Sequence, residues 1–135
     1  MNGLPASVLF ACSENSVRSP MAEALARRLY GQASYIDSVG VRASEVDGFV
    51  AAALDEVGID AHRHHAKTFE DVDPSSFDLI VTLSPEAHHR ALEVTRGTAA
   101  EVEYWPVSDP SAVEGTRDMR LAAYRQMRDQ LLARL

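Results

Sequence analysis

The only cysteine of the chain, Cys12, is followed six positions later by Arg18. The five residues between them can wrap around one small tetrahedral anion with their backbone N–H groups turned inward. The guanidinium of Arg18 can hold two oxygens of such an anion at once. The same positive surroundings favour the nucleophilic thiolate of Cys12. The spacing therefore predicts an anion-binding loop beside an activated thiol.

The whole loop is expected to line the anion. Its residues are Ser13, Glu14, Asn15, Ser16, Val17 and Arg18. A nucleotide-binding loop of the Walker type is excluded, because its glycines and its lysine are missing. The competing interpretation is that Cys12 is a packed core residue and Arg18 a surface charge. The position of the pair between an apolar strand and a helix start favours the functional interpretation.

A thiolate that attacks phosphorus needs a proton donor for the leaving oxygen, and Asp109 is the candidate. It follows an expected strand, so it should lie at the same edge of the sheet as Cys12. There it could protonate the leaving group and then activate the water that hydrolyses a cysteinyl-phosphate. The sequence is equally compatible with a simple turn at Asp109-Pro110.

A strand and a helix must position this loop. Residues 7–11 form a continuous apolar run, typical of a strand buried on both faces of a parallel sheet. Ser19, with a proline after it, is the expected N-cap of a helix. Apolar residues then recur every fourth position up to Leu29, and Glu23 with Arg27 forms an i,i+4 ion pair.

Strand and helix patterns alternate along the rest of the chain. Further strands are expected at residues 35–41, 77–83 and 102–107, and further helices at 47–57, 84–96 and 115–135, the last with Met119 on its buried stripe. This order predicts an α/β fold with three layers, a four-stranded parallel sheet carrying helices on both faces. Ligands of such sheets bind at the carboxyl ends of the strands, here the loops 12–19 and 108–111.

Composition excludes several classes of function. The chain has 135 residues, which suits a single domain over residues 1–135. A net charge of −7 opposes binding to a phosphate backbone, so no nucleic-acid partner is expected. No apolar run approaches the roughly 18 residues that cross a membrane. The first residues lack a basic segment of the secretory kind, so a cytoplasmic location is expected.

The chain resembles the low-molecular-weight protein-tyrosine phosphatases and the related thioredoxin-linked arsenate reductases. The resemblance rests on residues 8–12 with 18–24, on Asp37-Ser38-Val39-Gly40, on residues 77–83 and on Asp109-Pro110. It implies a fold like phosphotyrosine protein phosphatase I. It also implies a phosphorylated protein, a small phosphomonoester or another oxyanion as substrate, and no metal or organic cofactor.

The resemblance also assigns roles to residues. It implies Cys12 as nucleophile, Arg18 as phosphate clamp and Asp109 as general acid. Ser19 would hydrogen-bond the thiolate, while Asn15 and Ser38 brace the loop. His64 would support Asn15 or Ser38 from behind.

Several positions bear on the choice between the two branches. Relay-type arsenate reductases carry two more cysteines, where this chain has Ser84 and about Ala91, so an internal thiol relay is impossible. A reductase would need an external thiol. Lys67 follows the phosphatase pattern, because the reductases place an acidic residue of a potassium site there. Trp105 and Ser111 look more like the reductases, since phosphatases of this family usually follow Asp-Pro with a tyrosine.

The loop itself departs from both branches at Glu14, where glycine is usual. A carboxylate near a dianion opposes binding unless it points outward. We expect Glu14 to face solvent and to weaken anion affinity or favour substrates with a nearby cation. A non-catalytic oxyanion-binding module is therefore a third possible function.

Histidines cluster at His62, His64 and His65, with His88 and His89 later in the chain. No cysteine or carboxylate falls at ligand spacing beside them, so no metal site is expected. Trp105 is expected in the core.

Overall fold

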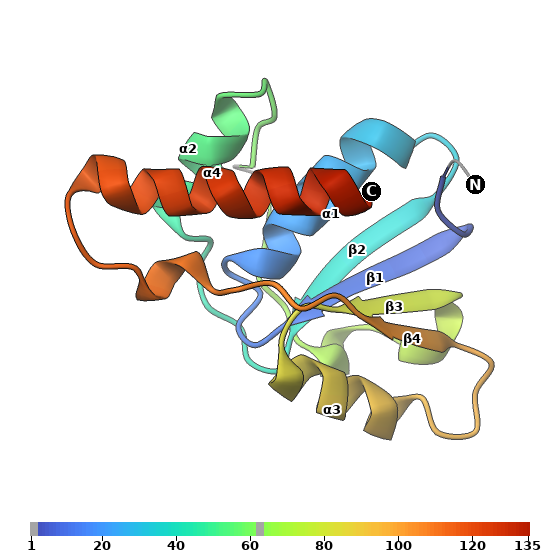
Figure 1. Ribbon diagram of the computed structural model, residues 1–135. Coiled ribbons are helices and arrows are strands. Elements are labelled where there is room, and N and C mark those ends of the chain that lie inside the picture. Colours follow the sequence, from blue (N-terminus) through green and yellow to red (C-terminus); the bar gives the residue numbers. More distant parts are fainter. Residues whose placement is uncertain (1–2, 62–63) are drawn as a thin grey trace.

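The computed structural model describes residues 3–61 and 64–135. Its four parallel strands form one sheet in the order β2-β1-β3-β4 (Figure 1). The strands are β1 (Ser7–Cys12), β2 (Tyr35–Gly40), β3 (Leu79–Thr82) and β4 (Glu101–Tyr104). The expected four-stranded parallel sheet is confirmed.

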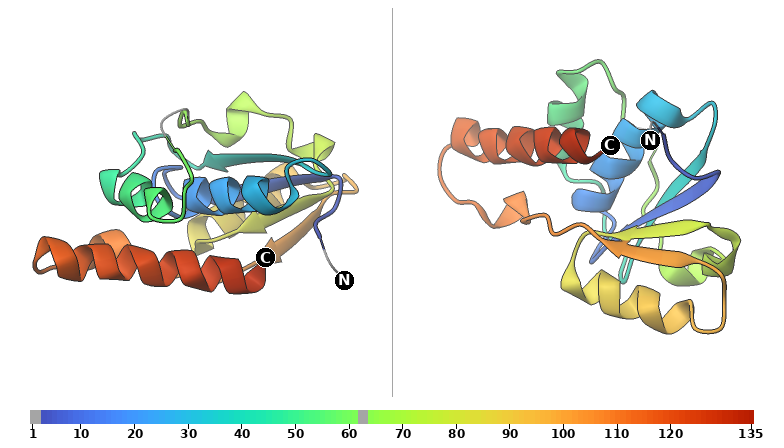
Figure 2. Two further views of the ribbon diagram at one scale, coloured as in Figure 1. Left: turned by 90° about the horizontal axis from the view of Figure 1, so that it is seen from above. Right: turned by 45° about the vertical axis from the view of Figure 1, so that its right-hand side comes forward.

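Helices cover both faces of this sheet (Figures 1 and 2). The helices are α1 (Arg18–Tyr30), α2 (Gly48–Asp55), α3 (Pro85–Val94) and α4 (Arg117–Arg134), with short 3₁₀ turns η1 (Phe69–Asp71), η2 (Pro74–Ser76) and η3 (Pro110–Ala112). The α1, α2 and α4 helices pack on one face and α3 on the other, which gives the three layers. Across residues 3–61 and 64–135, none of the helices combines the length and the apolar character that crossing a bilayer requires.

The alternation of β1 side chains explains the two cores. Val8, Phe10 and Cys12 face α1, α2 and α4, whereas Leu9 and Ala11 face α3. All five are at most 2% exposed. A strand with apolar residues on both faces can only lie between two layers of helices.

The strand register brings the functional loops together. Cys12 pairs with Gly40 of β2, and Thr82 of β3 lies between Ala11 of β1 and Tyr104 of β4. The carboxyl ends of all four strands therefore meet at one edge. The loops that leave this edge include the expected phosphate-binding loop and the loop of Asp109.

Three details differ from the sequence-based expectation. Ser19 is not an N-cap, because α1 begins at Arg18 and the Ser19 hydroxyl is used inside the site instead. Leu29 and Met119, expected on buried stripes, are 50% and 58% exposed. In α4 the buried stripe consists of Leu121, Tyr124, Met127 and Leu131. Trp105 lies in the core as expected, edge-on to Phe10.

Candidate active site

The loop between β1 and α1 is held from outside by the segment 41–47, which follows β2. Backbone N–H groups of this segment donate to four loop carbonyls at 2.8–3.1 Å. The donor–acceptor pairs are Val41 to Cys12, Arg42 to Ser13, Ser44 to Glu14 and Asp47 to Ser16. In a trans peptide the carbonyl and the next N–H point in opposite directions. The amides of Ser13, Glu14, Asn15 and Val17 therefore turn to the inner side of the loop, as in an anion-binding nest.

Gly40 permits this close packing. A Cβ at this position would lie 2.6 Å from the backbone nitrogen of Asn15 and 2.7 Å from the carbonyl carbon of Glu14. No side chain fits at that distance from backbone atoms. A glycine at the end of β2 is therefore needed for the loop to rest against the sheet.

Asn15 supplies the sharpest bend of the loop. It has φ = 53°, a left-handed conformation that asparagine adopts more readily than most residues. Its fully buried side chain donates to Ser19 Oγ at 2.8 Å and to Ser38 Oγ at 2.9 Å, and it accepts from the Lys67 amide at 3.0 Å. These bonds fix the bend and leave no polar atom of the amide unpaired.

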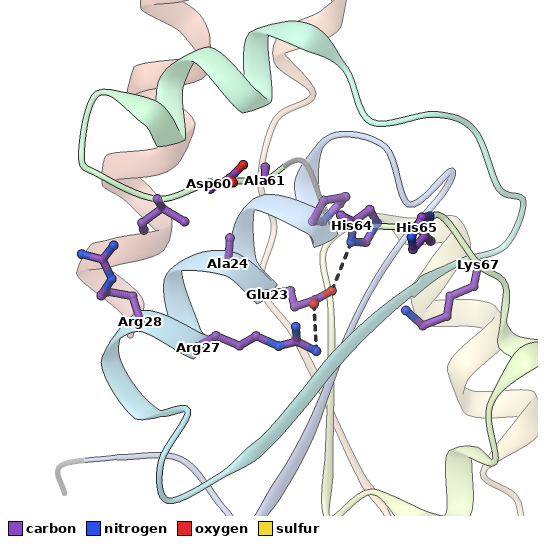
Figure 3. A pocket seen from close by; sticks show the side chains of 11 residues that line it. Glu23, Ala24, Arg27, Arg28, Asp60, Ala61, His64, His65 and Lys67 are labelled. Carbon is purple, nitrogen blue, oxygen red and sulfur yellow. Dashed lines mark ion pairs between the residues drawn. The ribbon is translucent and has the colours of Figure 1, made fainter.

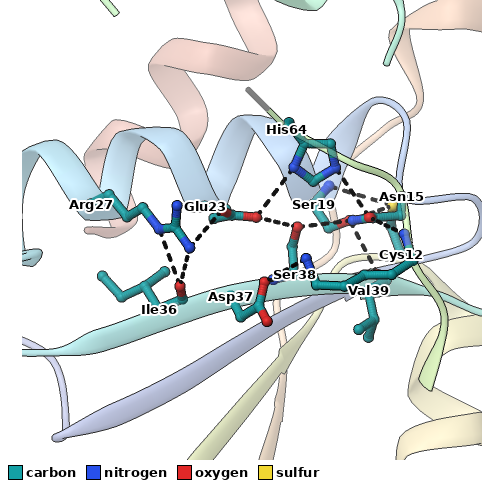
Figure 4. Close-up of polar contacts among 11 residues, drawn as sticks. Cys12, Asn15, Ser19, Glu23, Arg27, Ile36, Asp37, Ser38, Val39 and His64 are labelled. Atoms are coloured by element: carbon teal, nitrogen blue, oxygen red, sulfur yellow. Dashed lines mark hydrogen bonds and ion pairs between the residues drawn. The ribbon is translucent and has the colours of Figure 1, made fainter. Parts of the chain in front are cut away.

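Glu23 and His64 support Asn15 from behind (Figure 4). Ser38 Oγ donates to Glu23 Oε1 at 2.5 Å, and His64 Nδ1 lies 3.4 Å from the same oxygen. Arg27 closes the network at 3.1 Å from the other Glu23 oxygen. Burial acts to raise the pKa of Glu23, but hydrogen bonds from His64 and Ser38 and the charge of Arg27 hold it below its ordinary 4.5. The expected Glu23–Arg27 pair is therefore part of the site's scaffold, with Glu23 buried and Arg27 exposed.

His64 connects this carboxylate to the loop. Its Nε2 lies 3.1 Å from Asn15 Oδ1, while Nδ1 faces Glu23. Both ring nitrogens thus lie beside side-chain oxygens of the network. Lys67 ends the same segment, and its ammonium lies 2.7 Å from Asp37 Oδ1. The support of Asn15 by His64 expected from the resemblance is present in the structure.

Cys12 is 2% exposed at the floor of the loop. Its sulfur lies 2.9 Å from Ser19 Oγ and accepts a hydrogen bond from the Ser19 amide at 3.4 Å. The Ser19 hydroxyl is also 3.2 Å from the carbonyl of Val39. Its one hydrogen can serve either acceptor, so it can turn to the sulfur when the sulfur is ionised. The N-terminus of α1 adds the positive end of its dipole to the same space.

Arg18 lies at the other end of the loop. Its Nη1 donates to the carbonyl of Leu83 at 3.3 Å and to that of Val107 at 3.1 Å. These carbonyls belong to the segments after β3 and β4. The guanidinium is thereby held between the loop and the segment that leads to Asp109, and its remaining N–H groups are available to an anion.

The predicted meeting of the two loops occurs in one cavity of about 310 Å³. Its lining residues are Cys12, Ser13, Glu14, Ser16, Val17, Arg18, Arg42, Asp109 and Ser111. Asp109 Oδ1 accepts hydrogen bonds from the amide and the hydroxyl of Ser111, at 2.9 and 2.6 Å. Thiol, guanidinium and carboxyl group therefore open onto a common space, and none of the described residues that line it is aromatic.

Glu14 is exposed at the rim of this cavity, where the sequence analysis expected it. Its carboxylate lies 3.9 Å from Arg42 and accepts a long hydrogen bond of 3.4 Å from Ser44. Arg42 makes closer contacts of 2.7 and 3.0 Å to Glu86 of α3. These hydrogen bonds hold the pKa of Glu86 below its ordinary value. Glu14 does not need a glycine's conformational freedom, because φ is positive only at the next residue, Asn15.

A second cavity, of about 440 Å³, lies behind the loop (Figure 3). Glu23 and His64 form part of its wall, with Arg27, Arg28 and Lys67 around them. Within residues 3–61 and 64–135, no three His, Cys, Asp or Glu side chains are placed to hold a metal ion. His62 lies outside the described residues.

Sequence reasoning missed several parts of this site. Arg42, Ser111 and the buried role of Glu23 were not among the expected site residues. Ser84, expected as a helix start and as the substitute for a relay cysteine, is the N-cap of α3 and also lies against the loop, since Ser13 Oγ donates to Ser84 Oγ at 3.1 Å. Glu23 could have been found, because it follows Ser19 by four residues and so shares its helix face.

A family model for low molecular weight phosphotyrosine protein phosphatases matches residues 7–134. The chain belongs to this family. It is 31% identical over 130 residues to an arsenate reductase of Halalkalibacterium halodurans, a match that covers 95% of this chain and 91% of the relative. An arsenate reductase of Bacillus subtilis is 29% identical over 128 residues, with the same coverage.

Solved structures of the family give the same result. An arsenate reductase in its phosphate-binding state superposes with a TM-score of 0.75 at 26% identity, covering 99% of this chain and 93% of that one. A low molecular weight protein tyrosine phosphatase from T. tengcongensis gives 0.77 at 25% identity, with coverages of 94% and 92%. The expected family and fold are thus confirmed, and the protein is an enzyme of this phosphatase family.

Proposed function

We propose that the protein is a phosphomonoester hydrolase that acts on phosphorylated proteins through a cysteinyl-phosphate on Cys12. The observation that carries this proposal is the single cavity onto which Cys12, Arg18 and Asp109 open. The cytoplasm suits this chemistry, because Cys12 must remain a reduced thiol.

In the first step the Cys12 sulfur attacks phosphorus and the bond to the ester oxygen breaks. The inward amides of the loop and the Arg18 guanidinium hold the three other oxygens as charge develops on them. Each such preorganised donor contributes on the order of 3 kcal/mol to transition-state stabilisation. Asp109 gives its proton to the leaving oxygen, so that an alcohol and not an alkoxide departs.

In the second step Asp109, now a carboxylate, takes a proton from water. The water oxygen attacks phosphorus, the sulfur–phosphorus bond breaks, and phosphate leaves while the Cys12 thiolate is restored. Ser19 steadies the sulfur as an anion before and after each turnover. Asn15, Ser38 and His64 act only through the shape of the loop.

An arsenate reductase that depends on an external thiol is the second candidate. Two observations favour it: curated relatives carry that name, and the cavity lining has no aromatic side chain for a phenol ring. Cys12 would condense with arsenate and lose water. An external thiol would then attack the Cys12 sulfur, arsenite would leave with the bonding electron pair, and a second thiol would reduce the mixed disulfide.

One set of assays separates these functions. Purified protein is incubated with phenyl phosphate, and separately with arsenate and either glutathione or a glutaredoxin system. Phosphate release that disappears in Cys12→Ser supports the hydrolase. Arsenite formed only with an added thiol, without phosphate release, supports the reductase. Saturable binding of phosphate without either turnover would replace both with an oxyanion-binding module.

A further inference from the structure

Two arginines at the start of α4 share one aromatic ring. The guanidinium carbon of Arg120 lies 4.7 Å from the centroid of Phe49, and that of Arg117 lies 5.9 Å from the same centroid. A guanidinium over a ring face keeps its in-plane N–H groups free. Two cations are therefore held side by side with their hydrogen-bond donors available to a ligand.

These arginines have no carboxylate partner in the described part of the chain. Arg42, Arg90 and Arg125, in contrast, all pair with glutamates. One nearby carboxylate is engaged elsewhere. Both oxygens of Asp47 accept hydrogen bonds, from the Phe49 amide and from Tyr124.

The ring and its arginines lie near the active-site segments, because the charges of both Asp109 and Arg120 act on Tyr124, which stacks on Phe49. Phe49 comes two residues after Asp47, whose amide donates to the loop carbonyl of Ser16. Arg117 comes six residues after Ser111, which lines the cavity. An extended peptide advances about 3.3 Å per residue. Residues that flank a phosphorylated residue in the cavity could therefore reach this surface.

We propose that Arg117 and Arg120, stacked on Phe49, form a docking surface for acidic residues that flank the phosphorylated residue of a protein substrate. This inference rests on the proposed phosphatase function and adds the class of substrate. Carboxylates of the peptide would accept hydrogen bonds from the free N–H groups of both guanidinium ions. On the α3 side of the loop, the two carboxylates of Glu14 and Glu86 outnumber the one guanidinium of Arg42 that pairs with them, so an acidic segment is directed toward α4.

The test uses three phosphotyrosine peptides of one length, with glutamates, glutamines or lysines at the flanking positions. We expect kcat/KM for the glutamate peptide to exceed that for the glutamine peptide by about three- to tenfold, the effect of two exposed ion pairs. Salt should reduce this advantage. The double variant Arg117→Gln/Arg120→Gln should abolish it while leaving kcat/KM for phenyl phosphate unchanged. Arg96→Gln, which removes an exposed arginine just after α3, is the matched control and should keep the advantage.

Equal kcat/KM for the glutamate and glutamine peptides would overturn the docking surface, as would an equal loss in Arg96→Gln. If the proposed phosphatase function is wrong, the protein does not hydrolyse phenyl phosphate either. This result distinguishes failure of the proposed function from failure of the docking surface alone. In that case, binding of the three peptides to the Cys12→Ser protein is measured directly. Tighter binding of the glutamate peptide that depends on Arg117 and Arg120 would support the surface, and indifference to peptide charge would refute it.

Discussion

The hydroxyl of Tyr124 in α4 lies 2.9 Å from Asp47 Oδ2, at the end of the segment that holds the proposed phosphate-binding loop. Tyr124 is fully buried and stacks on Phe49 at 5.1 Å. Burial, the hydrogen bond to Asp47 and the charge of Asp109 all raise its pKa, so it stays a neutral donor. One hydroxyl therefore connects α4 to Asp47, whose backbone amide donates to the carbonyl of Ser16 in the loop.

The variant Tyr124→Phe keeps the stacked ring and removes only this hydrogen bond. We expect a loss of about 1–2 kcal/mol in the free energy of unfolding, because a partly buried oxygen of Asp47 loses its donor. The Michaelis constant for phenyl phosphate should rise, since the segment 41–47 is less firmly held. Urea unfolding and steady-state kinetics measure both effects. An unchanged Michaelis constant would show that the tie to α4 does not position the loop.

Gly40→Ala should damage the site directly. The added methyl group would meet the backbone of Asn15 and Glu14, neither of which can move without disturbing the loop. We expect phosphate binding, measured by calorimetry, to be lost, with a stability cost of about 1–3 kcal/mol from overpacking. Gly48→Ala is the matched control, because nothing lies within 4 Å of the added methyl group there. Normal phosphate binding by Gly40→Ala would contradict the proposed packing.

Glu14→Gly tests the charge at the rim of the cavity. We expect tighter binding of inorganic phosphate, because a carboxylate held only by contacts of 3.4 and 3.9 Å no longer opposes the dianion. Glu14→Gln separates charge from backbone freedom, and it should show most of the same gain. If both variants bind phosphate as the original protein does, Glu14 has no influence on affinity.

The low pKa of Glu23 makes stability depend on pH. Because its pKa in the folded protein lies below 4.5, the ionised carboxylate stabilises the fold above that pH, and this contribution disappears as pH falls through the folded-state pKa. Glu23→Gln should be less stable than the original protein at neutral pH, and the difference should shrink below pH 4.5. Urea unfolding across this range measures it. A constant difference at every pH would mean that the charge of Glu23 contributes nothing.

Local spacing was sufficient to predict the part of the site that one loop contains. Cys12 and Arg18 lie six residues apart on a strand–loop–helix unit, so their meeting depends little on the rest of the chain. Asp109 could be placed at the same edge only through the general geometry of parallel sheets. Arg42 could not be predicted, because its position depends on a backbone contact between 41–47 and the loop.

Ser19 shows how local signals can mislead. Serine followed by proline is a strong helix-start pattern, yet here the hydroxyl serves Cys12 and Asn15 inside the first turn of α1. The hydrogen bonds that Ser19 makes in the folded site therefore override the local preference of serine for the N-cap position. Met119 is a comparable case. Helical periodicity predicted that Met119 lies on the buried stripe of α4, but its side chain is exposed, and the buried stripe contains Tyr124 instead.

The most direct test of the account is to look for the covalent intermediate itself. The Asp109→Asn protein is mixed with an aryl phosphate whose leaving group is acidic enough to depart without a proton from Asp109. The reaction is then quenched with acid, and the protein is digested and analysed by mass spectrometry. We expect one phosphoryl group on the peptide that contains Cys12. The cysteinyl-phosphate should accumulate, because the asparagine of this variant cannot activate the water that hydrolyses it. A rapid burst of phenol with no phosphoryl group on Cys12, or phosphate release that survives in Cys12→Ser, would contradict it.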